Sequence, residues 1–127
     1  MEWQLAAGGE RKLKWPWGSA FQSEFCHAAG HDTTAVDTYP ASASPYGCFD
    51  MSGNAWEWVN DVVDDAQHRF TFLRGGSYYK AQHTWHAEGG PHPTDFHLKF
   101  QLLNEGLNRC ETVGFRCMKE AHDATNR

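Results

Sequence analysis

Apolar and polar residues alternate without interruption over residues 95–102, DFHLKFQL. A period of two places every second side chain on one face of an extended chain, so this segment predicts a half-buried β-strand. Two further segments are rich in strand-forming residues and also predict short strands: residues 70–79, FTFLRGGSYY, and residues 112–118, TVGFRCM. The double glycine in the first of them indicates a bulge or a close approach of another main chain.

Residues 1–10, MEWQLAAGGE, predict the end of a helix that stops where Gly8 or Gly9 can adopt a left-handed conformation. A short strand is predicted at Thr34–Tyr39, followed by a loop rich in serine, alanine and proline. We therefore expect an α+β fold with short antiparallel strands, one or two short helices and a high loop content. The length of 127 residues favours a single domain over residues 1–127.

The chain carries 11 basic and 16 acidic residues, and its lysines and arginines are scattered. No basic patch indicates binding to nucleic acid or to an anionic membrane surface, so we expect neither partner. No apolar run approaches the ~18–20 residues that a membrane span needs, and the first residues lack the features of a secretory signal. These observations favour a cytoplasmic protein.

Four cysteines are present: Cys26, Cys48, Cys110 and Cys117. An even number permits two disulfides with three pairings, whereas a reducing compartment favours four free, small apolar side chains. The absence of a CxxC pair argues against a zinc knuckle.

Four segments resemble, in this order, the signature blocks of the sulfatase-modifying-factor family: WPWG (15–18), SPYGCFDMSGNAWEWVND (44–61), FLRGGSYY (72–79) and VGFRC (113–117). That family includes the formylglycine-generating enzymes and the C-terminal domain of the ergothioneine-synthesis sulfoxide synthases. The resemblance runs from Glu2 to Met118 and corresponds to the C-terminal part of the family's usual domain, so the rest of that domain would precede Met1. It implies a variant of the C-type-lectin-like fold.

The resemblance also implies a copper-binding cysteine pair just after the Gly-Gly-Ser block. Thiolate pairs suit Cu(I) because soft sulfur ligands select that ion. Here Lys80 and Trp85 stand where the pair would fall, and no cysteine lies between Cys48 and Cys110. We therefore expect neither bound copper nor the formylglycine-generating reaction. The three-histidine iron site of the sulfoxide synthases belongs to a helical domain that this sequence does not contain.

Histidines are the remaining candidates for transition-metal chemistry. They gather in HTWHAEGGPHPTDFH, residues 83–97, where imidazoles and carboxylates could bind a metal. The candidate ligands are His83, His86, His92, His97, Glu88 and Asp95. The alternative is a polar loop with exposed histidines, because two glycines and two prolines interrupt the segment.

The block GNAWEW has two interpretations. The family resemblance implies a calcium loop, in which hard Ca²⁺ takes main-chain carbonyl oxygens and a carboxylate. The ligands would be Ser52, Gly53, Ala55 and Glu57. The alternative is a metal-free structural loop, in which Glu57 pairs with Arg74 or Arg116. In that case Asn54 bonds the loop backbone, and Trp56 and Trp58 fill the core.

Arg74 and Arg116 are the two arginines of the LRGG and GFRC blocks. Beside glycines, a guanidinium group can approach the main chain closely and bond carbonyls or carboxylates. The two arginines either hold a loop-rich core together or shape a site for an anion or a peptide carboxylate.

The leading hypothesis is a non-catalytic or catalytically divergent domain that binds a saccharide or a peptide through the loop after Gly-Gly-Ser. Its binding surface would comprise Tyr78, Tyr79, Lys80, His83, Trp85 and His86; the alternative is that Tyr78 and Trp85 are simply buried. One alternative is a metal-dependent oxidoreductase or half-enzyme that needs a partner chain. Another is an inactive fragment that self-associates as a homo-oligomer through an exposed apolar patch.

Overall fold

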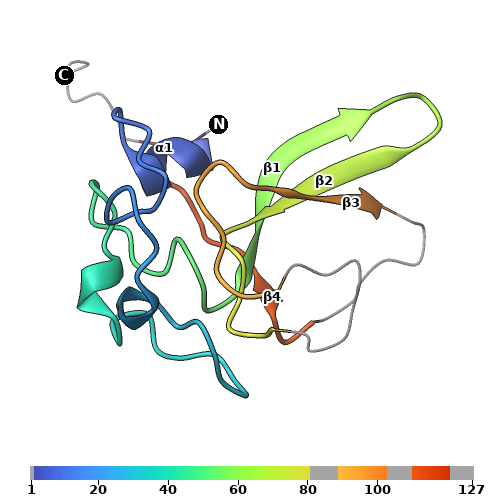
Figure 1. Cartoon of the computed structure of the whole chain (residues 1–127). Helices are drawn as coiled ribbons and strands as arrows, with labels where there is room; N and C mark the ends of the chain where they lie inside the picture. The colour runs from blue at the N-terminus through green and yellow to red at the C-terminus, as the bar shows by residue number, and fades with distance from the viewer. Residues whose placement is uncertain (1, 81–88, 103–109, 121–127) are drawn as a thin grey trace.

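The computed structural model describes residues 2–80, 89–102 and 110–120. Within these ranges the chain forms one α-helix, two short 3-10 helices and four β-strands. In chain order they are α1 (Glu2–Gly8), η1 (Ser23–Phe25), η2 (Pro40–Ser42), β1 (Trp56–Asp64), β2 (Arg69–Arg74), β3 (Leu98–Leu102) and β4 (Val113–Gly114). The long segment between α1 and β1 is mostly irregular and forms a lobe beside the sheet (Figure 1). The α+β class and the high loop content are confirmed.

The strands form one sheet in the order β3-β2-β1-β4. β1 and β3 both pair antiparallel with β2, whereas β4 runs parallel to β1 over two residue pairs. The expectation of an antiparallel sheet is therefore wrong at β4. In β1 the pairing register shifts between Val59 and Val62, which marks a bulge. Beyond it the β1–β2 hairpin projects away from the lobe (Figure 1).

Three predicted strands are present with tighter bounds. β2 ends at Arg74 because Gly75 and Gly76 have positive φ angles of 87° and 77°. A side chain at Gly76 would also overlap the facing main chain. β3 begins at Leu98 rather than at Asp95, and the C-terminal strand is only two residues long.

Two expectations for the first half of the chain are wrong. The segment Thr34–Tyr39 contains a turn, with the Thr38 amide donating to the Ala35 carbonyl, and no strand. The last three residues of the GNAWEW block, considered part of a loop, begin the nine-residue strand β1.

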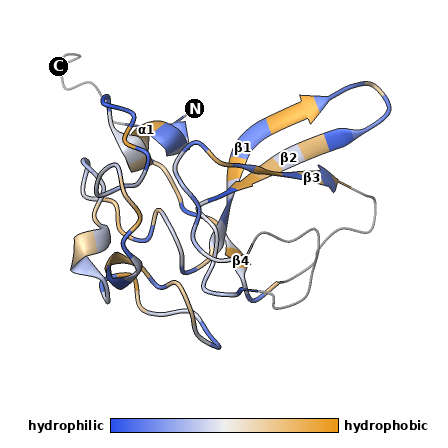
Figure 2. Ribbon diagram, in the orientation of Figure 1, coloured by the Kyte–Doolittle hydropathy of each residue, from blue (hydrophilic) through white to orange (hydrophobic). Residues whose placement is uncertain are grey.

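The apolar core of the described residues is small. Trp3 and Ala7 of α1 pack with Met51, and Val59 of β1 and Cys48 pack against this group. Apolar residues also occur away from it: β1 carries an apolar stretch toward its outer end (Figure 2), where Val62 and Val63 are exposed. Polar contacts must therefore fix much of the lobe.

Candidate functional site

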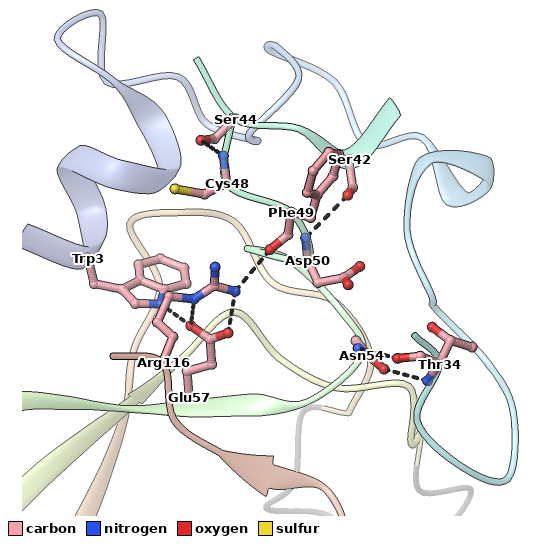
Figure 3. A network of polar contacts seen from close by, with 10 residues as sticks. All are labelled: Trp3, Thr34, Ser42, Ser44, Cys48, Phe49, Asp50, Asn54, Glu57 and Arg116. Atoms are coloured by element: carbon pink, nitrogen blue, oxygen red, sulfur yellow. Dashed lines mark hydrogen bonds and ion pairs between the residues drawn. The ribbon is translucent and has the colours of Figure 1, made fainter. Parts of the chain in front are cut away.

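Glu57, near the start of β1, lies at the centre of a buried polar cluster. Its Oε2 atom accepts hydrogen bonds from Trp3 Nε1 at 2.6 Å and from Arg116 Nε at 2.7 Å. Its Oε1 atom accepts one from Arg116 Nη2 at 2.5 Å, and the same nitrogen donates to the Phe49 carbonyl at 2.9 Å (Figure 3). This cluster joins α1, β1, the preceding loop and the segment after β4.

Arg116 is thus the arginine that pairs with Glu57. Burial lowers the pKa of Arg116, but the hydrogen bonds and negative charge of Glu57 outweigh burial and hold that pKa above its ordinary value. The bidentate geometry is the strong form of an arginine–carboxylate pair.

Arg74 has a different environment. Its Nη1 donates to the carbonyls of Thr94 and Phe96, at 3.5 and 3.2 Å, and its buried Nε has no partner among the described residues. Burial lowers the pKa of Arg74, while the charges of Asp61 and Asp95 act in the opposite direction. Arg74 therefore holds the residue 93–96 turn against β2.

Asn54 ties three segments together. Its side-chain Oδ1 accepts from the Thr34 amide at 3.0 Å, and its Nδ2 donates to the Thr34 carbonyl at 3.2 Å. Its own amide donates to the His27 carbonyl, and its carbonyl accepts from the Tyr78 amide, each at 3.0 Å. These contacts agree with the loop-bonding role considered for Asn54.

The two tryptophans of the block differ in burial. Trp56 is 8% exposed, and its ring stacks on His92 with centroids 5.1 Å apart. Trp58 is half-buried and meets Phe100 edge to face at 5.8 Å. Only Trp56 is therefore a fully buried anchor.

Other polar groups of the residues expected to bind calcium hold this loop to neighbouring segments. The Ser52 hydroxyl donates to the His92 carbonyl at 2.9 Å, and the Gly53 amide donates to the Gly75 carbonyl. Both carboxylate oxygens of Glu57 already accept hydrogen bonds from cationic or indole donors. These contacts are the ones expected for Glu57 in the metal-free alternative, and calcium binding by Ser52, Gly53, Ala55 and Glu57 stays a prediction.

Asp50 is a functional candidate that the sequence reasoning missed. It is 5% exposed, and among the residues that the structure describes no hydrogen bond to its carboxylate oxygens meets the distance and angle limits. Burial raises the pKa of Asp50 to about 6; Arg116 opposes this rise and Glu57 adds to it. The only sequence signal was an acidic residue directly before an apolar one, in a loop with glycine.

The expected ligand-binding surface is divided by the structure. Tyr78 is 3% exposed and its ring lies 5.6 Å from that of His27, so Tyr78 follows the buried alternative and not the expected surface. Burial raises the pKa of Tyr78, and nearby acidic groups add to the rise. Tyr79 is 55% exposed and Lys80 is exposed. The remaining expected residues, His83, Trp85 and His86, lie outside the described residues.

The histidine cluster is likewise only partly described. His92 is buried and stacked on Phe96 at 4.0 Å, and His97 is exposed with an edge-to-face contact to Phe72. His83, His86 and Glu88 lie outside the described residues, and Asp95 is exposed. Within residues 2–80, 89–102 and 110–120, no three His, Cys, Asp or Glu side chains are grouped to hold a metal.

The base of the loop that carries Tyr79 is fixed by main-chain hydrogen bonds. The Ser77 amide donates to the Gly90 carbonyl at 3.1 Å, and the Gly90 amide donates to the Tyr79 carbonyl at 2.9 Å. An isolated bridge pairs Gly76 with Pro91. The two sides of the loop base are therefore held together below an exposed tyrosine and lysine.

A solved structure shares the fold of this chain. The crystal structure of CarF matches it with a TM-score of 0.52 and 20% identity, over 90% of this chain and 42% of CarF. The family profile described as "Sulfatase-modifying factor enzyme 1-like domain" matches residues 1–121. The chain belongs to this family, as the four ordered sequence blocks predicted.

Curated relatives from bacteria and mammals match 94% of the chain. The serine/threonine-protein kinase Pkn1 of Chlamydia trachomatis is 39% identical over 136 residues, 20% of its own length. The inactive C-alpha-formylglycine-generating enzyme 2 of Mus musculus is 26% identical over 134 residues, 41% of its length. The chain spans less than half the length of the curated relatives it matches, from 10% to 42%. No helix in the described part of the chain is long and apolar enough to span a membrane.

Proposed function

We propose that this chain is a non-catalytic, ligand-binding member of its family, which recognises a saccharide or a peptide through the loop after Gly76. The proposal rests on the main-chain hydrogen bonds that hold the two sides of the loop base together. They fix the position from which the exposed Tyr79 and Lys80 project. The missing cysteine pair supports the non-catalytic part, because no cysteine lies between Cys48 and Cys110. A relative named as an inactive enzyme is similar over nearly the whole chain.

The chemistry of the two exposed residues suits these ligands. A tyrosine ring offers an apolar face to a sugar ring or a peptide side chain and a hydroxyl for hydrogen bonding. The lysine ammonium donates to hydroxyl or carboxylate oxygens. Fixing the loop base before binding lowers the ordering cost of association.

The proposal extends to the fold variant, the cellular location and the bound metals. The scaffold is a variant of the C-type-lectin-like fold, and the chain is cytoplasmic, in keeping with its free cysteines. The loop before β1 takes Ca²⁺ through main-chain carbonyls, and no copper is bound. A copper titration with a Cu(I) chelator as competitor tests the last point: stoichiometric capture of the ion by the protein would contradict it.

Glycan and peptide arrays probed with the labelled protein test the main proposal. We expect specific hits that weaken at least about tenfold in Tyr79→Ala, in the range of an aromatic contact. Tyr46→Ala is the matched control, because Tyr46 is 56% exposed and lies in another loop. Arrays without hits, or equal loss in both variants, would overturn the proposal.

We also propose that the chain self-associates, because the segment after β4 exposes two large apolar residues. Phe115 is 75% exposed and Met118 is 65% exposed. β4 is the last strand of the described sheet beside β1, and edge strands of two identical chains can pair across a two-fold axis. Sedimentation should show a dimer that the double variant Phe115→Ser, Met118→Ser dissociates. Val36→Ser, at another exposed position, is the control; a wild-type monomer at high micromolar concentration would refute the idea.

A further inference from the structure

The strand β3 forms one outer edge of the sheet. The strand order β3-β2-β1-β4 gives β3 a single neighbour, β2, among the residues that the structure describes (Figure 1). In an antiparallel pair, every second residue of an edge strand turns its amide and its carbonyl away from the neighbour. β3 is five residues long and contains no proline, whereas β4, at the opposite edge, pairs over only two residues. β3 is therefore the longer template for the addition of another strand.

One face of β3 is apolar up to the free edge. Residues that pair directly across an antiparallel sheet share a face. Leu98 pairs with Leu73, and the Phe100 ring meets the Trp58 ring edge to face at 5.8 Å, so these side chains lie on the same face. Leu102 shares this face and is 44% exposed, while Leu98 and Phe100 are half-buried. Apolar side chains of an added strand would extend this face.

The opposite face of β3 carries a positive charge. Lys99 pairs with Phe72, and its Nζ lies 4.0 Å from the centroid of the diagonally placed Phe70 ring. Lys99 is exposed, and no ion pair joins it to an acidic residue within the described part of the chain. Gln101, on the same face, is uncharged. An acidic side chain opposite Lys99 would therefore supply the charge that complements this face.

The lysine also argues against a second copy of the chain at this edge. If two copies paired antiparallel about Phe100, each Lys99 would face Gln101 of the other copy, and the two lysines would be diagonal neighbours on one face. Like charges at that spacing repel, and a lysine on an edge strand is a known device against the pairing of identical edges. A foreign strand with a carboxylate at that position is attracted instead.

We propose that β3 binds an extended peptide as a further antiparallel strand, with apolar residues beside Leu98, Phe100 and Leu102 and an acidic residue opposite Lys99. Main-chain hydrogen bonds provide attraction that is independent of sequence, and the alternating side chains provide specificity. This surface is separate from the loop after Gly76, so the inference goes beyond the ligand binding proposed for that loop and does not depend on it.

Fluorescently labelled peptides test the proposal by anisotropy. In Val-Thr-Val-Glu-Val, flanked by serines, the valines fall opposite Leu102, Phe100 and Leu98, and the glutamate falls opposite Lys99. We expect saturable binding with a Kd below about 1 mM. A peptide with lysine in place of glutamate should bind roughly three- to tenfold more weakly. Two further peptides are N-methylated on alternate amides, and only one of them should lose binding, because every second amide faces β3.

Charge reversal in the protein provides the matched experiment. Lys99→Glu should prefer the lysine peptide to the glutamate peptide, whereas Lys14→Glu, at an exposed lysine of the lobe, should keep the wild-type preference. Tyr79→Ala should bind these peptides as wild type does, which separates this surface from the loop after Gly76. Amide hydrogen exchange in residues 98–102 should slow when the peptide binds.

Three results would overturn the proposal. They are the absence of binding at about 1 mM peptide, an unchanged peptide preference in Lys99→Glu, and loss of binding in both N-methylated peptides or in neither. A dimer that persists in the double variant Phe115→Ser, Met118→Ser and is dissociated by the peptide would show that a second copy occupies β3, and this too would overturn it.

Discussion

Glu57→Gln should be among the most destabilising single substitutions of a polar side chain in this domain. The Glu57 carboxylate accepts three hydrogen bonds, two of them from Arg116. Hydrogen bonds to charged groups contribute about 1.5–3 kcal/mol each, and removing one partner of a buried ion pair costs about 3–5 kcal/mol. The side chains of Glu57 and Arg116 are 11% and 32% exposed, so solvent reduces the effect toward the lower limit. We expect a loss of about 3 kcal/mol in the free energy of unfolding.

A double-mutant cycle with Glu57→Gln and Arg116→Met, measured by urea unfolding in EDTA, isolates the pair. We expect a coupling energy of about 2 kcal/mol. The matched control is the Asp64–Arg69 pair at 3.3 Å, whose side chains are 53% and 67% exposed. Exposed pairs contribute roughly 0.2–1 kcal/mol. A Glu57–Arg116 coupling no larger than that of the control pair would refute the reasoning.

Three further predictions concern single positions. Gly76→Ala should destabilise by more than about 3 kcal/mol in urea unfolding, because it combines positive φ with a main-chain clash, whereas Gly114→Ala, with open space around its Cβ, should change little. Burial raises the pKa of the Cys26 thiol to about 11, so a thiol reagent should modify Cys26 only when the protein unfolds. The exposed Cys110 should react at once, and equal modification rates of the two cysteines would contradict this prediction. In EDTA, the raised pKa of Asp50 means that its stabilising contribution is complete below about pH 4 and is lost as the pH rises through about 6. The free energy of unfolding of Asp50→Asn minus that of wild type should therefore increase by about 2–3 kcal/mol between pH 4 and pH 7.5. If this difference does not change with pH, the carboxylate is not buried.

The sequence predicted strands where alternation was uninterrupted or where strand-forming residues were dense. Residues 98–102 alternate cleanly and are β3, and residues 69–74 are rich in phenylalanine, threonine and leucine and are β2. In β1 the apolar residues Val62 and Val63 are adjacent in the sequence, and the pairing register shifts between Val59 and Val62, so this strand has no uninterrupted alternation. Local pattern could not reveal this strand because its pairing with β2 compensates for the irregularity.

The candidate site shows a similar limit. The sequence indicated that Glu57 would pair with an arginine, but it could not choose between Arg74 and Arg116, because the choice depends on which loop folds over β1. Asp50 was missed for the same reason: an aspartate in a polar turn is normally solvated, and only tertiary packing buries it. The tyrosine pair after Gly-Gly-Ser gave no signal of which ring faces inward.

The loop of residues 50–55 and the proposed ligand-binding loop share main-chain hydrogen bonds, and this has a functional consequence. The Asn54 carbonyl accepts from the Tyr78 amide at 3.0 Å, and the Gly53 amide donates to the Gly75 carbonyl at 2.9 Å. A cation that orders the first loop therefore also steadies the base from which Tyr79 projects, without touching the ligand. Because linkage between two binding sites is reciprocal, Ca²⁺ should raise ligand affinity and the ligand should raise calcium affinity by the same factor. Titrating the best array hit by calorimetry, with and without Ca²⁺, should show this coupling in wild type, and an identical Kd in both conditions would show that the two loops respond independently.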